Sequence, residues 1–131
     1  MSFKFGTAIN CIDGRTQQRV IDYMVQNHDV DGVDMITFPG ADGMFSSQER
    51  AVEVELARRA VSISVERHNS KVIAVVGHHD CAGNPVDKER HYMHIRRAVE
   101  KVQSWGLPTR IIGLYVNDEW QIEQVSQILL T

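Results

Sequence analysis

The stretch Phe5-Gly-Thr-Ala-Ile-Asn-Cys11-Ile-Asp13-Gly-Arg15 decides the fold of this chain of 131 residues. Its first half belongs to an apolar run, Lys4 to Asn10, that is typical of a buried β-strand. A thiol, a carboxylate and a guanidinium follow directly after this run. In a parallel α/β sheet, functional side chains gather where the strands end. The stretch therefore predicts the first strand of such a sheet, with reactive groups at its carboxyl end.

A second stretch, Val76-Gly77-His78-His79-Asp80-Cys81-Ala-Gly83, repeats this arrangement after an apolar run from Lys71 to Val76. It supplies histidines and the second of only two cysteines in the chain. Two thiolates and one imidazole form a complete three-ligand set for zinc, with a fourth position left for water or another side chain. The sequence thus predicts a zinc site. A disulfide between the cysteines, or two inert buried thiols, is the alternative, but neither explains the accompanying His, Asp and Arg.

Strand and helix patterns alternate along the rest of the chain. The segments predicted as strands are Lys4–Asn10, Val33–Phe38, Lys71–Val76 and Thr109–Val116. Of the three helices between them, the first is capped by Thr16 and the third starts at Asn84-Pro85. A Ser46-x-x-Glu49 capping box opens the second, whose apolar arc is wide enough that we expect it to be well buried. Glu119 to Val125 is predicted as an antiparallel fifth strand, with a terminal helix as the alternative.

This order predicts an α/β fold in which residues 1–131 form one domain. Right-handed crossovers between parallel strands place helices on both faces of the sheet. We expect the strand order 2-1-3-4, with the fifth strand antiparallel at the edge. The chain reverses its direction of growth between strands one and three, which opens a crevice at their carboxyl ends. Both cysteines should meet in that crevice.

The two stretches resemble the motifs of the β-class carbonic anhydrases, which are Cys-x-Asp-x-Arg after a first strand and Gly-His-x-x-Cys, followed by a glycine, after a later one. The resemblance covers most of the chain and implies a zinc lyase that reversibly hydrates carbon dioxide to bicarbonate. It implies that Cys11, His78 and Cys81 bind Zn2+, with Asp13 and Arg15 as the catalytic pair. The ligand is His78 rather than His79 because the family's histidine directly follows the glycine. The resemblance also implies a homodimer or a larger assembly.

The spacing of Asp13 and Arg15 suggests how the site is controlled. Asp13 is close enough in sequence to Cys11 to become a fourth zinc ligand, which would close the coordination shell and exclude water. Arg15 can hold the carboxylate in a bidentate pair and keep it off the metal. In the family this pair switches between open and closed zinc, and the nucleophile is a zinc-bound hydroxide. The alternative is a surface ion pair at the start of a helix.

Composition excludes several classes of protein. A formal net charge of −3 gives no field that would attract nucleic acid or an anionic membrane. We find no signal-peptide pattern at the N-terminus and no apolar run long enough for a membrane span. Cysteines in ligand-like motifs, rather than in a disulfide framework, predict a reducing cytoplasm. The chain lacks the Gly-x-Gly-x-x-Gly turn of a dinucleotide enzyme.

Parts of the chain depart from the family. Its Arg-Asn-Ala-Gly-like stretch after strand two is replaced by Phe38-Pro39-Gly40-Ala41-Asp42-Gly43. Two alternative functions therefore remain, a non-catalytic zinc-binding module of the same fold and a hydrolase of a related small molecule such as carbonyl sulfide. We expect His91 and His94 to be exposed and Asp80 to be solvated. His79 should be a solvent-facing or supporting group.

Overall fold

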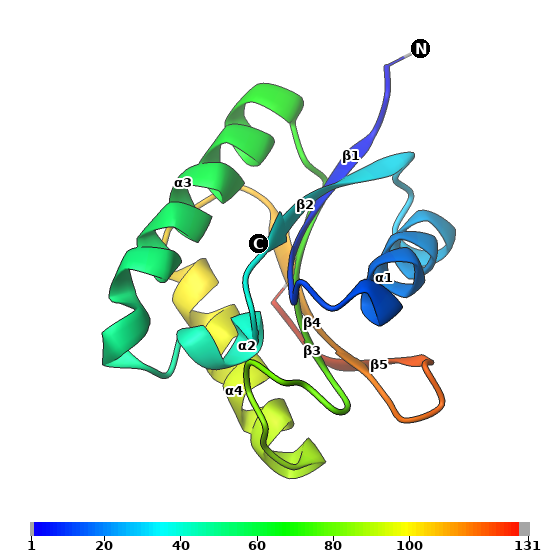
Figure 1. Ribbon diagram of the computed structural model, residues 1–131. Coiled ribbons are helices and arrows are strands. Elements are labelled where there is room, and N and C mark those ends of the chain that lie inside the picture. Colours follow the sequence, from blue (N-terminus) through cyan, green and yellow to red (C-terminus); the bar gives the residue numbers. More distant parts are fainter. Residues whose placement is uncertain (1, 129–131) are drawn as a thin grey trace.

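The computed structural model describes residues 2–128 and shows one five-stranded sheet in the order β2-β1-β3-β4-β5 (Figure 1). The strands are β1 (Phe5–Asn10), β2 (Gly32–Thr37), β3 (Val72–His78), β4 (Arg110–Val116) and β5 (Ile122–Ile128). The first four are parallel, whereas β5 runs antiparallel to β4. The predicted α/β class and strand order are confirmed, and so is the antiparallel fifth strand. The alternative of a terminal helix is wrong.

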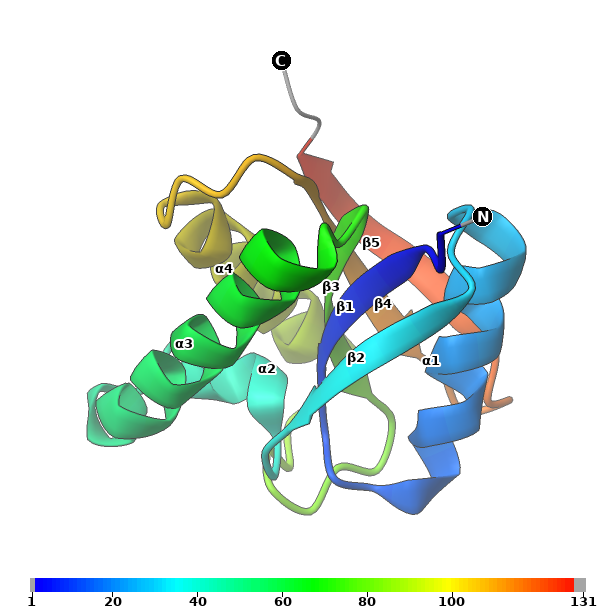
Figure 2. The same ribbon diagram turned by 90° about the horizontal axis from the view of Figure 1, so that it is seen from above.

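Helices cover both faces of the sheet, as predicted. One face carries α1 (Gly14–Asn27), and the other carries α2 (Ala41–Met44), α3 (Ala51–His68) and α4 (Lys88–Gln103), as Figures 1 and 2 show. A short 3-10 turn, η1 (Gln48–Arg50), joins α2 to α3. Within residues 2–128, no helix has both the length and the hydrophobicity that crossing a membrane would require.

The central strand β3 is buried on both faces because successive side chains enter different hydrophobic cores. Ile73 and Val75 pack under α3 and α4, whereas Ala74 and Val76 pack under α1. Burial of each such Val or Ile side chain contributes about 1.5–3 kcal/mol. A slip of this strand by one residue would move every side chain into the opposite core, where its size and shape do not fit, so its carboxyl end is firmly placed.

Two helices begin elsewhere than the sequence predicted, because aspartates rather than the expected residues cap them. Asp13 caps α1, since its side chain accepts a hydrogen bond from the backbone N–H of Arg15, 2.9 Å away. Thr16 lies inside the helix and donates to the carbonyl of Asp13 at 2.8 Å. Likewise, Asp87 caps α4 by accepting from the N–H of Arg90 at 2.8 Å, so that the prediction of Asn84-Pro85 is wrong.

The expected capping box at Ser46 and Glu49 is also wrong, and α3 is less buried than its sequence suggests. The chain between β2 and α3 breaks into α2 and η1 because Ala41 and Met44 turn into the core, where both are fully buried. Only one stripe of α3 is buried. Exposed hydrophobic side chains on this helix are Val52 at 73%, Leu56 at 51% and Ile63 at 54%.

Two glycines allow the loops that follow β2 and β3 to touch. A Cβ on Gly40 would lie 2.4 Å from the carbonyl carbon of Gly83, and a Cβ on Gly83 would lie 2.5 Å from the nitrogen of Gly40. Gly40 also has a left-handed backbone, with φ of 56°, which glycine adopts without strain. The two loops therefore pass each other where no side chain fits.

We expect Gly83→Ala to lower the free energy of unfolding by about 1–3 kcal/mol, because the added methyl group meets backbone atoms that cannot swing aside. Urea unfolding measures this loss. The matched control is Gly14→Ala at the first position of α1, where an added Cβ has no neighbour within 4 Å. Equal stability of the two variants would show that the loops do not need this close contact.

A polar cluster fixes β5 to α4. Glu123 accepts hydrogen bonds from Asn117 at 2.9 Å, from Lys88 at 3.1 Å and from the hydroxyl of Tyr92. These bonds, that from Asn117 above all, lower the pKa of Glu123 from 4.5 to about 2. Burial, reinforced by the bond to Glu123, raises the pKa of Tyr92 to about 12. The cluster ties the C-terminal hairpin to the helix layer.

Glu123→Gln should reduce stability most at neutral pH. Because the folded-state pKa is depressed, the carboxylate contributes stability above pH 4.5, and this contribution is lost as the pH falls toward 2. We expect a loss of about 1 kcal/mol at neutral pH, modest because the side chain is partly exposed. Urea unfolding at several pH values checks it, with exposed Glu119→Gln as control. A stability difference that stays constant down to pH 2 would contradict the role of the ionised group.

Candidate metal centre

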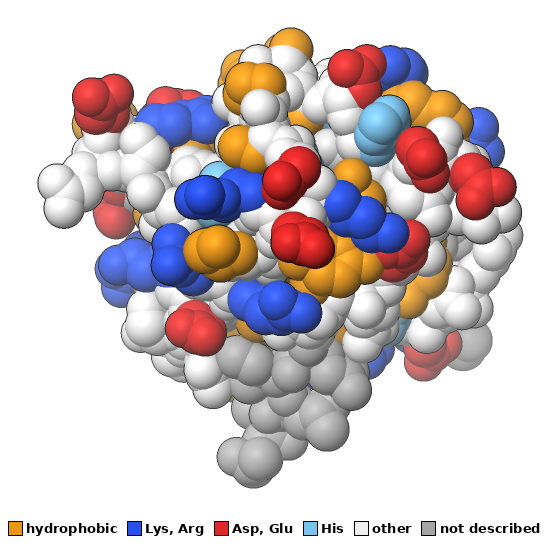
Figure 3. Space-filling model, turned by 90° about the horizontal axis from the view of Figure 1, so that it is seen from below, with side chains coloured by type: hydrophobic (Ala, Val, Ile, Leu, Met, Phe, Trp, Pro, Cys, Tyr) orange, Lys and Arg blue, Asp and Glu red, His pale blue; other side chains and the backbone are white. Residues whose placement is uncertain are grey.

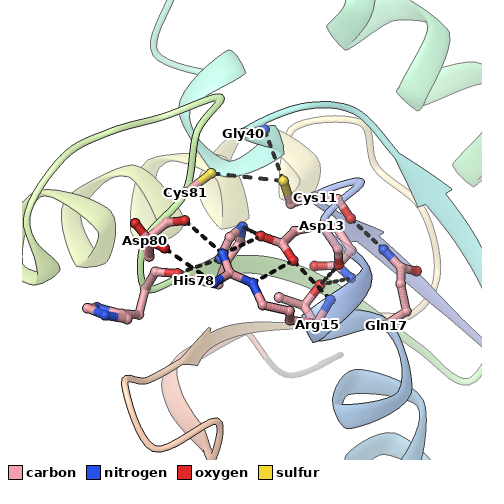
Figure 4. A network of polar contacts seen from close by, with 11 residues as sticks. Cys11, Asp13, Arg15, Gln17, Gly40, His78, Asp80 and Cys81 are labelled. Atoms are coloured by element: carbon pink, nitrogen blue, oxygen red, sulfur yellow. Dashed lines mark hydrogen bonds and ion pairs between the residues drawn. The ribbon is translucent and has the colours of Figure 1, made fainter.

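The two cysteines and His78 meet at the carboxyl end of the sheet (Figure 4). Cys11 directly follows β1, His78 is the last residue of β3, and Cys81 lies in the loop beyond. Since β1 and β3 are parallel neighbours, their ends lie side by side. The two sulfurs and a ring nitrogen of His78 all lie within 4.8 Å of one another, and all three side chains are buried. The structure thus brings together the three residues that the sequence singled out.

The ring of His78 is oriented with one nitrogen free. Nδ1 lies 2.7 Å from the backbone carbonyl of His79, so it donates its proton there. Nε2 then carries the lone pair, and in the part of the chain that the structure describes this buried atom has no hydrogen-bond partner. A buried acceptor without a partner is costly in a folded protein. A metal ion would satisfy it, because ligating histidines typically bond a carbonyl through the other nitrogen.

The thiols of Cys11 and Cys81 are free, with their sulfurs 3.9 Å apart. A disulfide would bring them to about 2.05 Å, so the structure does not contain the bridge considered as an alternative. The hydrogen bond between the two thiols lowers the pKa of Cys11 and raises the pKa of Cys81. The N–H of Gly40, 3.4 Å from the sulfur of Cys11, also stabilises its thiolate. The three side chains could hold a metal ion.

Asp13 is turned toward Arg15. The guanidinium donates to both carboxylate oxygens, from Nε at 3.1 Å and from Nη2 at 2.7 Å. These hydrogen bonds lower the pKa of Asp13 to about 2. The nearer carboxylate oxygen lies 3.9 Å from Nε2 of His78, so Asp13 borders the cluster without joining it. The pair therefore lies at the start of α1, directly beside the cluster.

Asp80 is not simply solvated, which corrects the expectation for this residue. Its carboxylate accepts from Nη1 of Arg15 at 3.2 Å, and its backbone carbonyl accepts from Nη2 at 3.1 Å. Figure 4 shows the guanidinium between Asp13 and Asp80. His79, by contrast, is exposed as expected.

Sequence reasoning missed a buried polar network beside the cluster. His91, expected to be exposed, is only 1% exposed, and its Nδ1 lies 2.6 Å from the carboxylate of Asp42. Asn84 donates to the same carboxylate at 3.1 Å and lies 3.0 Å from Nδ1 of His94. Gly77 makes room, since a Cβ there would lie 2.5 Å from Asp42. The network ties α2, α4 and the Cys81 loop together.

The sequence did contain a signal for His91. It lies four residues before Ile95 and eight before Val99, on the buried stripe of α4. Asp42 was the lone acidic residue among small and apolar neighbours from Ala41 to Met44. Neither signal indicates that Asp42 and His91 are partners, because the two residues lie 49 positions apart in the sequence.

A pocket of about 540 Å³ opens beside Cys81. Its walls include His79, Lys88, Tyr115 and Asn117, which carry both hydrogen-bond donors and acceptors. Seen from the end at which the parallel strands finish, acidic and basic side chains are interspersed among hydrophobic ones (Figure 3). A second pocket of similar size, beside Lys71, lies at the opposite end of the sheet and away from the thiols.

Comparison with known proteins gives the same fold. The structure is similar to a β-carbonic anhydrase, isoform I, of the protozoan Trichomonas vaginalis, with a TM-score of 0.58 and 15% identity over 99% of this chain and 86% of that one. It is also similar to a structure from work on two tetrameric β-carbonic anhydrases of the ascomycete Sordaria macrospora, with a TM-score of 0.57 and 11% identity over 98% of this chain and 83% of that one. At such identities the likeness concerns the fold alone.

Sequence comparison identifies the family. No curated protein matches the chain. A family model described as "Putative carbonic anhydrase" matches residues 1–126, which is nearly the whole chain. This match confirms the resemblance that the two motifs carry, and the chain belongs to that carbonic anhydrase family.

Proposed function

We propose that this protein is a zinc-dependent lyase that reversibly hydrates carbon dioxide to bicarbonate, with the chain forming one zinc domain. One observation carries the proposal. The buried cluster of Cys11, His78 and Cys81 offers three metal ligands while Arg15 keeps the neighbouring carboxylate of Asp13 occupied. Three protein ligands and one open position are the mark of a catalytic zinc site.

The cluster suits zinc in its spacing. Two thiolates at the usual zinc–sulfur distance of about 2.3 Å lie about 3.8 Å apart in a tetrahedral site. The sulfurs of Cys11 and Cys81 are 3.9 Å apart, and Nε2 of His78 is free to be the third ligand. When bound, zinc supplies Lewis acidity that lowers the pKa of water, so that a hydroxide-like nucleophile is present near neutral pH. Free thiols as ligands also suit a reducing compartment such as the cytoplasm.

The protein's own groups would position the reacting water. With its pKa near 2, Asp13 is ionised throughout the physiological pH range and can only accept hydrogen bonds. Held by Arg15, it can accept one from the nucleophilic water and orient it toward carbon dioxide. Arg15 at the same time prevents Asp13 from taking the open metal position. Asp13 and Arg15 together would thus orient the reacting water and keep the fourth metal position open.

The two other candidate functions differ from the lyase in observable ways. A non-catalytic zinc module would use a closed shell of four protein ligands, which here requires Asp13 to leave Arg15. The bidentate contact between these two residues favours an open site. A hydrolase of carbonyl sulfide would use the same metal ligands, and release of hydrogen sulfide distinguishes it from carbon dioxide hydration.

We expect one zinc per chain in the purified protein, measured by elemental analysis. Cys81→Ala should lose most of the metal, whereas His79→Ala should keep it, because His79 is the neighbouring histidine that does not join the cluster. Full zinc retention in Cys81→Ala would refute the ligand assignment.

Stopped-flow measurement should show hydration of carbon dioxide by the zinc-loaded protein. Asp13→Asn is expected to lower kcat/KM by about 100-fold or more, since it removes the ionised acceptor that orients the water. If the wild-type protein binds zinc but does not hydrate carbon dioxide, the proposed activity is wrong. The remaining candidate functions are then a non-catalytic zinc module and a carbonyl sulfide hydrolase.

We also propose that the protein forms a homodimer or a larger assembly. The exposed hydrophobic side chains of α3, Val52, Leu56 and Ile63, support a partner surface on this helix. The Sordaria macrospora enzymes with the same fold are described as tetrameric.

Sedimentation velocity should therefore give more than the 14.9 kDa of one chain. Leu56→Lys should shift the distribution toward monomer, because it places a charge in the proposed interface. Val25→Lys, on the opposite face and 40% exposed, should not. A wild-type monomer at high micromolar concentration would contradict the assembly.

A further inference from the structure

Arg15 must be held in place if it is to control Asp13, yet it is an exposed side chain. The Arg15 side chain is 48% exposed, compared with 19% for Asp13. An ion pair with an exposed partner is usually weak, because a long side chain in water samples many rotamers. The contact with Asp13 alone is therefore a poor restraint. Other groups must limit the motion of the guanidinium.

Two residues from distant parts of the chain provide such limits. Asp80, after β3, accepts two hydrogen bonds from the guanidinium. Trp120, in the turn between β4 and β5, places its ring 4.7 Å from the guanidinium carbon of Arg15, within the range of a cation–π contact. The indole is also 6.4 Å from the ring of His79, in an edge-on arrangement. Arg15 thus contacts two carboxylates and one aromatic face. Because the Asp80 side chain is itself 70% exposed, the ring of the partly buried Trp120 is the firmer of the two added restraints.

The backbone of Trp120 is in a conformation that suits this residue type badly. Non-glycine residues with positive φ, among residues 2–128, are Asp29, Asn69, Asp80 and Trp120. Asp and Asn tolerate the left-handed region, but a bulky residue is strained there. Trp120, at φ of 59°, is the exception.

The turn itself does not need an indole. Oδ1 of Asn117 accepts from the N–H groups of Glu119 and Gln121, and the carbonyl of Asn117 accepts from the N–H of Trp120 at 2.9 Å. These contacts, made by Asn117 and by backbone N–H groups, close the turn whatever side chain position 120 carries. The ring packs against the hydrophobic core on the α1 side of the sheet and contacts Arg15, and these two contacts, rather than the turn, account for a tryptophan in a strained position.

We propose that Trp120 is a positioning residue, which fixes Arg15 in the geometry that keeps Asp13 turned away from the metal centre. The inference rests on the proposed function and deepens it, because it assigns control of the open site to the C-terminal hairpin. Without the ring, the guanidinium gains rotamers and releases the carboxylate of Asp13 for part of the time. The freed carboxylate can then reach the metal position. A contact of this kind changes the ratio of held to released Asp13 by about two- to fivefold.

The test uses Trp120→Asn, because asparagine tolerates the left-handed backbone and should leave the turn folded. Cobalt replaces zinc, since its visible absorption reports whether the fourth ligand is water or a carboxylate. Arg15→Ala supplies the reference spectrum for Asp13 on the metal. We expect the spectrum of Trp120→Asn to move toward this reference by a two- to fivefold change in the ratio of the two forms. Trp120→Phe, which keeps an aromatic face, should restore part of the wild-type spectrum.

Two controls separate positioning from a merely structural effect. Trp105→Leu removes the other tryptophan, which packs near Phe45 and Arg58, and should leave the cobalt spectrum unchanged. In an Asp13→Ala background, Trp120→Asn should have no effect, because the carboxylate on which it acts is gone. An unchanged spectrum in Trp120→Asn, or an equal change in the Asp13→Ala background, would overturn the proposal.

A second readout does not depend on metal chemistry. In NMR spectra of the purified protein, the Nε–H of Arg15 should show a ring-current shift from Trp120 and slow hydrogen exchange from its bond to Asp13. Trp120→Asn should abolish the shift and speed the exchange several-fold. Unchanged exchange would overturn the proposal even if the protein hydrates carbon dioxide. If the protein fails to bind cobalt or zinc, the proposed function fails, while this measurement still decides whether Trp120 restrains Arg15.

Discussion

The parallel pairing of β1 with β3 is the constraint on which the site depends. The register pairs Thr7 with Ile73 and Ile9 with Val75, so the two strands finish side by side. Both are buried in the centre of the sheet, where a slip by one residue would move each side chain into the core on the other face and disrupt its packing. Backbone pairing and core packing thus fix the backbone positions of Cys11 and His78 without any contribution from a metal.

Cys81 lies in a loop, and its position depends on contacts of a different kind. The close approach of Gly40 and Gly83 locks the loops after β2 and β3 together. The buried network of Asp42, His91 and Asn84 then ties the Cys81 loop to α2 and α4. The two carboxylate oxygens of Asp42 are paired with Asn84 and His91, although Nε2 of His91 is buried without a partner among the described residues. Such a network favours one loop position over its alternatives, which a ligand site requires.

In the proposed metal site, Arg15 and the metal would compete for the carboxylate of Asp13. Arg15 donates two hydrogen bonds to it from an exposed side chain, while a zinc ion held by two thiolates and a neutral imidazole would carry no net charge and would attract the carboxylate only moderately. When two partners are nearly balanced, a further contact of about 1 kcal/mol changes the outcome several-fold. For this reason Asp80 and Trp120, which contact Arg15, would influence the proposed reaction although they take no direct part in it.

The sequence by itself determined the strand order, the helices on both faces and the approximate meeting point of the cysteines with His78. These depend on local periodicity and on the topology of parallel sheets, which short stretches such as Phe5 to Arg15 record. The roles of these residues as metal ligands and catalytic groups stay predictions. The predicted starting residues of the helices were wrong because several polar residues near the beginning of each helix can serve as its cap, and only packing selects one.

Only the tertiary structure decided the pairing of Asp42 with His91, the placement of Trp120 over Arg15 and the exposure of the apolar side chains on α3. Each of these depends on which residues far apart in the sequence come within a few ångströms. The helical periodicity indicates that His91 is buried, but no pattern along the chain indicates which carboxylate is its hydrogen-bond partner. The physical reason is that side-chain contacts arise from the packing of whole elements, whereas sequence patterns record only the elements themselves.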